Sequence, residues 1–218
     1  GTGHAVMQAQ ETLQGRSEMV LVCYGDMPLL EAETLQRLVD NQARGAGVMT
    51  ILTLVHPESM GFGRVIRGAE GQVLEVVEEK VATPEQRAIE ELNCGVYCFD
   101  AEWLWAHIND IPLNPVKEEY FLTDMVGIAV EDGRRVDAVS IHDPEQVIGI
   151  NTRVHLSWAE AAMRRRINER LMLAGVTLQD PASTYIEAGV EVGPDTTILA
   201  NTHLTGRTTV GRGCTIGP

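Results

Sequence analysis

The sequence lacks any long apolar run. No stretch approaches the ~20 uninterrupted apolar residues of a membrane-spanning helix, and no secretory-type series of basic, apolar and small residues opens the chain. We therefore expect a soluble, cytoplasmic protein with no membrane partner.

Basic residues are also scarce. The 218-residue chain has 17 lysines and arginines against 31 aspartates and glutamates, which gives a net charge of −14. Because this charge repels a phosphate backbone, no nucleic-acid partner is expected. Small anionic substrates need a metal ion or helix N-termini to neutralise them, so we expect a divalent cation.

Cysteine is limited to four residues, and none has the CxxC spacing of thiolate zinc sites. The surroundings of all four are apolar or strand-like, which predicts buried thiols. They are Cys23, Cys94, Cys98 and Cys214.

Apolar residues make up 44% of the chain, enough for a substantial core. Short apolar runs alternate with helical patterns over residues 1–151, which predicts an α/β fold with an open sheet and parallel neighbours. The run at 19–24 is expected to be a central strand, buried on both faces. The other predicted strands are 49–55, 73–77, 95–99 and 136–141, and the predicted helices are 4–13 and 30–45.

Residues 152–173 contain no glycine or proline and carry an apolar stripe, which predicts a long helix ending at Gly175. Its three consecutive arginines, 164–166, point around the helix, and we interpret them as a solvated surface.

From Ile186 the sequence has a six-residue period, which predicts a parallel β-helix. Each unit forms one side of a triangular coil, with an aliphatic residue inside and a small residue at the corner. The aliphatic positions are Ile186, Val192, Ile198, Leu204, Val210 and Ile216. The predicted division is therefore a domain at 1–151, a linker helix at 152–175 and β-helix coils at 176–218.

Several short segments carry candidate site residues with two interpretations each. Asp26 follows a predicted strand, where open α/β sheets bind ligands. It is either a magnesium ligand or a turn former or helix N-cap before Pro28. Thr2, in Gly1-Thr2-Gly3-His4, lies either beside a nucleotide or at a helix N-cap. Gly63, in Gly61-Phe62-Gly63-Arg64, belongs either to a ligand-binding loop or to an ordinary turn.

Eight motifs occur in order along the chain: GTGHA, VCYGDMPLL, GFGRVIR, VVEEKVATPEQ, ELNCGVYCFD, EEYFLTDM, VIGINTRVHL and AGVTLQDPASTYI, followed by the hexapeptides. Together they resemble the bifunctional N-acetylglucosamine-1-phosphate uridyltransferase/glucosamine-1-phosphate acetyltransferase family, over essentially all 218 residues. This resemblance implies a Rossmann-like, GT-A-like nucleotidyltransferase domain with a mixed sheet, then a linker helix and the start of a left-handed parallel β-helix.

On the nucleotide side, the resemblance implies that Gly1 and Thr2 contact the uracil. It also implies that Tyr24, Gly25 and Asp26 line the sugar-nucleotide site, with the Asp26 carboxylate on Mg²⁺.

On the sugar side, the resemblance implies that Gly63 approaches the sugar through its backbone. Glu78 and Asn93 would hold the hydroxyl and acetamido groups of N-acetylglucosamine. Asn151 would be the second protein ligand of the metal.

The reaction that the resemblance implies is in-line attack by the phosphate of N-acetylglucosamine 1-phosphate on the α-phosphorus of UTP. It yields UDP-N-acetylglucosamine and pyrophosphate. Because the nucleophile is already an anion, positioning and charge neutralisation matter more than a general base. We therefore assign no catalytic acid or base.

The chain also departs from the family pattern. A strand and Gly-rich loop resembling L-A-A-G-x-G-T-R-M, followed by a lysine, cradle the triphosphate in the family, and the chain has no such segment. Val81 and Cys94 stand where the family has Asp and Thr, and Lys117-Glu118 replaces Gln-Gly. We therefore expect weak or no turnover from this fragment.

The acetyltransferase site of the family lies between neighbouring subunits, beyond the position of residue 218. We expect no acetyl transfer by this chain, and a homotrimer only for the longer parent protein.

Two other interpretations remain. The first is a nucleotidyltransferase that acts on another hexose 1-phosphate or another nucleotide. The second is a non-catalytic assembly subunit that keeps the fold. Asp26 together with Asn151 argues against the subunit, because a protein without metal chemistry has no need of both.

Overall fold

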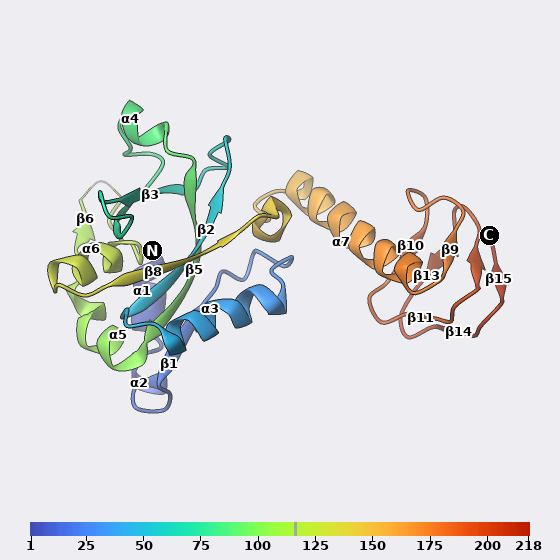
Figure 1. Cartoon of the computed structure of the whole chain (residues 1–218), viewed down its shortest axis with the longest axis horizontal. Coiled ribbons are helices and arrows are strands. Elements are labelled where there is room, and N and C mark those ends of the chain that lie inside the picture. The colour runs from blue at the N-terminus through green and yellow to red at the C-terminus, as the bar shows by residue number, and fades with distance from the viewer. Residues whose placement is uncertain (116) are drawn as a thin grey trace. The chain divides into compact units, whose positions relative to one another are not determined.

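The computed structural model describes residues 1–115 and 117–218, which form two compact units, 1–147 and 148–218 (Figure 1). None of the helices in these described ranges is long and apolar enough to cross a membrane.

The first unit is built on a six-stranded mixed sheet with the order β4-β3-β5-β2-β8, and β1 pairs with β5 beside this path. β2 and β8 are parallel, whereas β5 runs antiparallel to β1, β2 and β3. The mixed sheet is therefore confirmed. The strands are β1 (Met19–Val22), β2 (Met49–Val55), β3 (Gly63–Arg67), β4 (Val73–Val77), β5 (Glu91–Asp100) and β8 (Val136–Ile141).

The strand at 19–24 differs from the prediction of a strand buried on both faces among parallel neighbours. β1 is shorter and, among the described residues, pairs only with β5, in antiparallel register. Leu21 is 38% exposed. An apolar run fixes the presence of a strand, but not its neighbours or their direction.

Alternation along β5 divides the core of the first unit into two layers. Cys94, Val96 and Cys98 face the layer that contains Leu38 of α3 (Ala32–Arg44). Tyr97 and Phe99 face the opposite layer. This period of two is expected for a strand covered on both sides.

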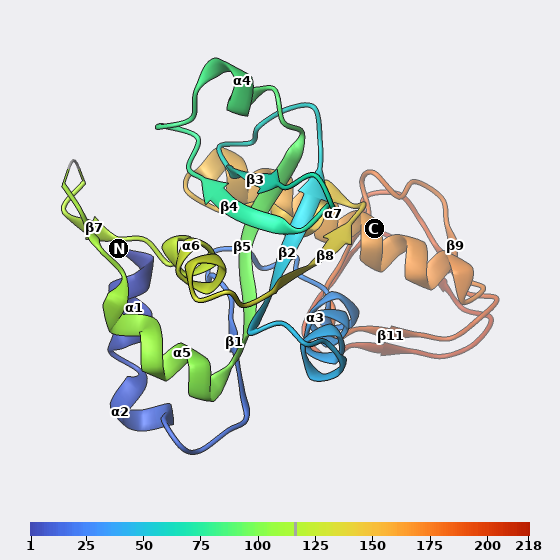
Figure 2. The ribbon, with the colours of Figure 1, turned by 60° about the vertical axis from the view of Figure 1, so that its left-hand side comes forward.

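The helices of the first unit follow these two layers. In Figure 2, α3 lies on one side of the sheet, whereas α5 (Ala101–His107) and α6 (Asp124–Glu131) lie on the other. The remaining elements of this unit are short: α4 (Pro84–Arg87), β6 (Leu113–Asn114), β7 (Glu119–Tyr120) and the 3-10 turns at Ile108–Asp110 and Pro144–Val147.

The predicted helix at 4–13 is broken into α1 (Thr2–Met7) and α2 (Gln10–Leu13). A tight turn separates them, in which the Ala9 amide donates to the Val6 carbonyl at 2.9 Å. The Gln10 side chain then donates to the Trp105 carbonyl at 3.0 Å. Contacts with α5 thus redirect a segment whose composition favours one continuous helix.

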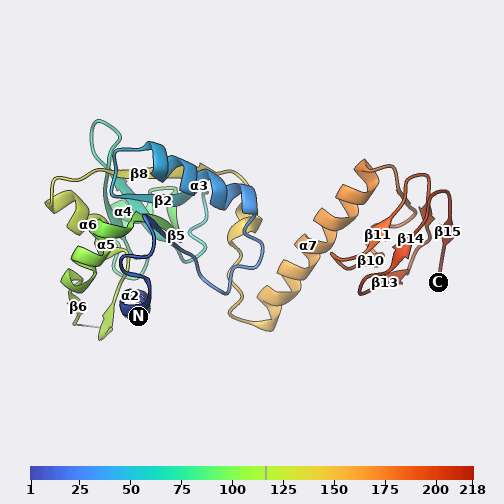
Figure 3. The same ribbon diagram turned by 90° about the horizontal axis from the view of Figure 1, so that it is seen from below.

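The second unit begins with α7 (Arg153–Leu173), and Figure 3 shows this helix leading into the strands of the coils. Thr152 caps the helix, because its hydroxyl accepts from the His155 amide at 3.2 Å. The prediction for 152–173 is therefore confirmed. Arg164 does not lie free in solvent, since its guanidinium packs 4.4 Å from the Tyr185 ring centroid.

The hexapeptide positions form short parallel strands that stack at an offset of 18 residues, such as Tyr185 with His203 and Thr197 with Thr215. The aliphatic residues of the repeat fill one core together with Ile167 and Leu171 of α7. The parallel β-helix is thus confirmed. Its strands are β9 (Thr177–Leu178), β10 (Tyr185–Ile186), β11 (Glu191–Val192), β12 (Thr197–Ile198), β13 (His203–Leu204), β14 (Thr209–Val210) and β15 (Thr215–Ile216).

The four cysteines are all reduced, but they are not equally buried. Cys94 and Cys98 are buried as predicted, whereas Cys214 is half-buried and Cys23 is exposed. Cys23 lies immediately after β1, where the chain leaves the sheet.

Candidate functional site

Tyr24 lies at the centre of the candidate site. Its ring packs against the backbone of Gly95, whose φ is +75° and where a Cβ would collide with the ring. Burial, and then the charge of Glu78, raise the pKa of the Tyr24 hydroxyl, which also hydrogen-bonds to Thr2 and Tyr97. The phenol is therefore a neutral hydrogen-bonding group at physiological pH.

Asn93 and Tyr97 form a buried pair on β5. Asn93 is 5% exposed, and its Nδ2 donates to the Tyr97 hydroxyl at 2.7 Å. Burial places the pKa of Tyr97 well above that of a free tyrosine. The side chains of Asn93, Tyr97 and Tyr24 thus form an uncharged hydrogen-bond network. This network restricts the orientation of the Asn93 side-chain amide.

Glu78 supplies a carboxylate next to this network. The Thr123 hydroxyl donates to Glu78 Oε1 at 3.0 Å. Asp124 follows at the start of α6, and burial, together with the charges of Glu78 and Glu75, raises the pKa of its carboxyl. The site therefore combines amide and hydroxyl groups with a local excess of negative charge.

Gly63 is the first residue of β3 rather than part of an ordinary turn, and it pairs with Asn93 in the sheet. A Cβ at this position would lie 3.0 Å from the Val77 carbonyl oxygen. The glycine is therefore explained by close strand packing, and this pairing brings its backbone beside Asn93.

Thr2 does not cap a helix. Gly1 is the N-cap of α1 without a side-chain bond, and the Thr2 hydroxyl accepts from the Leu122 amide at 3.0 Å. A Cβ on Gly1 would lie 2.6 Å from the Tyr120 carbonyl oxygen. The lack of a side chain at Gly1 thus permits packing against β7, and Thr2 connects this corner to Tyr24.

Gly25 and Asp26 form an exposed turn after β1. Asp26 is not an N-cap, because α3 begins after Glu31. Its carboxylate is close enough to influence the pKa of Tyr24. Asp26 therefore lies next to the aromatic centre of the site.

Asn151 belongs to the second unit, where it is exposed. Its backbone N–H donates to His155 Nδ1 at 3.3 Å. The described part of the chain contains no group of three or more His, Cys, Asp and Glu side chains suited to a metal. The predicted metal pair, Asp26 and Asn151, thus remains a prediction.

The structure brings together six of the predicted site residues: Thr2, Tyr24, Asp26, Gly63, Glu78 and Asn93. It adds Gly95, Tyr97, Thr123 and Asp124, which the sequence did not single out. A glycine inside a strand often marks a close approach, so Gly95 carried a usable signal. Tyr97, Thr123 and Asp124 had none, because their roles depend on tertiary contacts.

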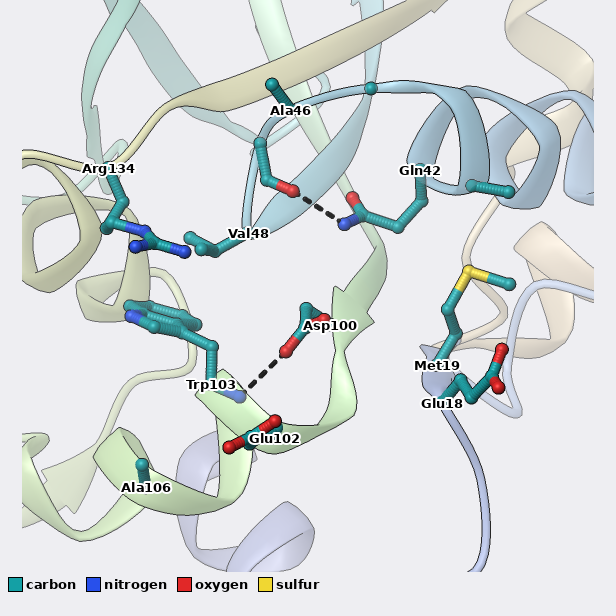
Figure 4. Close-up of a pocket in the computed structure, with 13 residues that line it drawn as sticks. Glu18, Met19, Gln42, Ala46, Val48, Asp100, Glu102, Trp103, Ala106 and Arg134 are labelled. Carbon is teal, nitrogen blue, oxygen red and sulfur yellow. Dashed lines mark hydrogen bonds between the residues drawn. The ribbon is translucent and has the colours of Figure 1, made fainter.

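A separate cavity of about 710 Å³ lies where β1 and β2 begin and β5 ends. Figure 4 shows Asp100, Trp103, Gln42 and Arg134 around it. Asp100 Oδ1 accepts from the Trp103 amide at 2.8 Å, and Gln42 donates to the Gly47 carbonyl at 2.8 Å. None of the predicted site residues lines this cavity.

Comparison with known families gives one domain match, to the family described as nucleotidyl transferase, over residues 1–191. The chain is also similar to curated proteins named bifunctional protein GlmU. It is 46% identical to the Trichlorobacter lovleyi protein over 99% of its own length and 47% of the relative's. For the Exiguobacterium protein the identity is 46%, over 100% of the chain and 48% of the relative. The chain thus spans about half the length of these relatives.

Solved structures share the fold at low sequence identity. A CMP:2-keto-3-deoxy-manno-octonic acid synthetase complexed with CTP matches with a TM-score of 0.57 and 12% identity, over 76% of this chain and 69% of the other. A Bacillus anthracis protein described as a glucose-1-phosphate thymidylyltransferase matches with a TM-score of 0.54 and 16% identity, over 74% and 60%.

Proposed function

The chain belongs to the nucleotidyl transferase family, and from this premise we propose that it transfers a uridylyl group from UTP to N-acetylglucosamine 1-phosphate. The observation that supports this substrate is the network that joins Asn93, Tyr97, Tyr24 and Thr2, with Glu78 beside it. A carboxylate, an amide and neutral hydroxyls are suited to hydrogen-bond the hydroxyl and acetamido groups of a sugar.

The proposed step forms a bond between a phosphate oxygen of N-acetylglucosamine 1-phosphate and the α-phosphorus of UTP. The bond from that phosphorus to the β-phosphate bridging oxygen breaks, and pyrophosphate leaves with the electron pair. No proton has to be removed from the anionic nucleophile. The contribution of the protein is therefore alignment and electrostatic stabilisation.

We propose Mg²⁺ as the ion that neutralises the phosphates, with Asp26 as one ligand and Asn151 as the other. Mg²⁺ prefers oxygen ligands and keeps positions open for phosphate and water. The exposed Asp26 carboxylate, in a turn beside Tyr24, fits this requirement. When bound, the ion would polarise phosphate oxygens, while Tyr24, Glu78 and Asn93 orient the sugar.

The test is to measure the binding of UDP-N-acetylglucosamine to the chain by calorimetry with Mg²⁺. Glu78→Gln and Asn93→Asp should weaken binding at least tenfold, because each removes a hydrogen-bonding group that is held in place. UDP-glucose, which lacks the acetamido group, should bind less tightly than UDP-N-acetylglucosamine to the wild type. Equal binding of the two sugars would count against this substrate and favour another hexose.

A second measurement is pyrophosphate release with UTP, Mg²⁺ and N-acetylglucosamine 1-phosphate. We expect the release to require N-acetylglucosamine 1-phosphate as well as UTP and Mg²⁺, because the sugar phosphate supplies the attacking oxygen. Release that does not depend on the sugar phosphate would refute this expectation.

For the longer protein we propose the three-part division into 1–151, 152–175 and 176–218, followed by further coils. In that protein the β-helix would support acetylation of glucosamine 1-phosphate and a homotrimer. We further propose that it acts in the cytoplasm, where its nucleotide donor is available. Mass measurement of the longer protein in solution tests the trimer directly.

A further inference from the structure

A deeply buried arginine lies directly beside the candidate site. Arg64 follows Gly63 in β3, and its side chain is only 3% exposed. Its Nη1 lies 2.6 Å from Oε2 of Glu79. A buried charge is costly unless it is paired, so this ion pair demands a structural or functional reason.

The guanidinium of Arg64 joins three separate segments. Nη1 also donates to the Phe62 carbonyl at 2.6 Å, and Nη2 donates to the Arg87 carbonyl at 3.5 Å. The loop before β3, the turn after β4 and the end of α4 therefore converge on one side chain. Arginine is suited to this role because its donors form a rigid planar fork.

Two of these segments carry site residues next to the groups that Arg64 holds. Gly63 lies between Phe62 and Arg64 and pairs with Asn93. Glu78 precedes Glu79, and its carbonyl accepts from the amides of Val81 at 3.0 Å and Ala82 at 3.1 Å. Arg64 thus links the segment before Gly63 to Glu79, the residue that follows Glu78.

We propose that Arg64 is a positioning residue, which through its ion pair with Glu79 sets the location of Glu78 relative to Asn93. It does not touch the substrate. This inference rests on the proposed function for its effect on the sugar, but the fixed backbone geometry can be tested without any ligand.

β3 also offers a matched control. Arg67 forms a two-contact ion pair with Glu91, with both distances 2.6 Å, but its side chain is 37% exposed. Exposed pairs contribute little to stability. Arg67→Lys therefore tests the loss of a guanidinium from the same strand outside the site.

The experiment compares Arg64→Lys, Glu79→Gln and Arg67→Lys with the wild type. Glu79→Gln keeps the bond from Arg64 to Phe62 and nearly the original shape, so it guards against a simple failure to fold. Binding of UDP-N-acetylglucosamine and of UTP is measured by calorimetry. Amide hydrogen exchange is followed at residues 61–63 and 78–82.

Arg64→Lys and Glu79→Gln should weaken UDP-N-acetylglucosamine about tenfold, equal to ~1.4 kcal/mol, while UTP affinity changes less than about twofold. Exchange at both segments should accelerate, and Arg67→Lys should leave both measurements unchanged. An equal loss for both ligands, or unchanged sugar binding, would overturn the positioning role.

If the wild type binds neither ligand, the proposed function fails, and the role of Arg64 is then decided by exchange alone. Faster exchange at both segments in the Arg64 and Glu79 variants would support the role of this ion pair in holding the backbone. Unchanged exchange would refute it.

Discussion

Gly95 has a strict steric requirement, because it combines a positive φ of +75° with direct contact to the Tyr24 ring. An alanine would adopt a strained backbone and displace this ring. We expect Gly95→Ala to lower the free energy of unfolding by about 3 kcal/mol, measured by urea denaturation.

Gly127→Ala is the control for this substitution. Gly127 lies within α6, with nothing within 4 Å of the added Cβ. Alanine should stabilise the helix there by up to ~1 kcal/mol. Similar destabilisation at both positions would show that crowding by Tyr24 is not the cause.

The thiols should differ in reactivity. Burial raises the pKa of Cys94 to about 12 and that of Cys98 to about 11. At pH 8 their thiolate fractions are ~10⁻⁴ and ~10⁻³, and the thiolate is the reactive form. A disulfide reagent should therefore modify exposed Cys23 first, then Cys214, and the other two only after unfolding. Rapid reaction of all four in the native protein would contradict this order.

Asp124 gives a prediction for pH. Burial and the charges of Glu78 and Glu75 raise its folded-state pKa above the ordinary 3.8. Between the unfolded-state pKa and the higher folded-state pKa, the folded protein binds more protons at Asp124 than the unfolded chain does. The contribution of Asp124 to the free energy of unfolding therefore falls as the pH rises through this range. Asp124→Asn should raise the free energy of unfolding at pH 7 but not at pH 3.5, as measured by urea denaturation. A greater gain at the lower pH would reverse the assigned sign.

At the residue scale, the family resemblance predicted Glu78 and Asn93 from the motifs that contain them, and the structure places both near Tyr24 and Tyr97. It did not identify Tyr97 or Thr123. Tyr97 joins the site through Tyr24, which is far from it in the chain, and the partner of Thr123, Glu78, is 45 residues away. Asp26 and Asn151 belong to different units, and their pairing stays a prediction.

At the scale of elements, periodic patterns predicted best. The hexapeptide strands agree with their sequence pattern, because each six-residue unit repeats the same buried aliphatic position. Helix α7 agrees with its apolar stripe and its lack of glycine and proline. β1 was placed among parallel neighbours, whereas its described partner is antiparallel β5. An apolar run shows that a strand is buried, but it does not show which strand pairs with it or in which direction. The sequence pattern therefore could not predict the antiparallel pairing of β1 with β5.

Ile198 tests the interior of the coils. It is fully buried in β12, the middle strand of the β9-β12-β15 sheet. Ile198→Ala should cost about 3 kcal/mol in the second unit through lost burial and a cavity. Ile216→Ala, at the last strand and half-buried, should cost less. Equal costs would mean that the coils are not packed as a continuous core.

At the scale of the whole molecule, the two units have separate apolar cores. Calorimetry should therefore resolve two unfolding transitions, and Ile198→Ala should lower the temperature of only one. Trp158→Phe leaves Trp103 and Trp105, so that fluorescence reports on the first unit alone. If Ile198→Ala shifts this fluorescence transition, the units unfold cooperatively.

The stacking offset of the coils also has an evolutionary consequence. Because Tyr185 lies against His203, Glu191 against Thr209 and Thr197 against Thr215, each side of the coils from residue 185 onward recurs after 18 residues. The earlier strand β9 pairs with β12 at an offset of 20 residues. A gene duplication that copies one whole coil would lengthen the structure without changing the partner type of any strand. A copy of a single hexapeptide would keep aliphatic residues inside but move every later strand to the next side. Descendants of this sequence can therefore gain or lose whole coils while every surface residue stays on the same side of the β-helix.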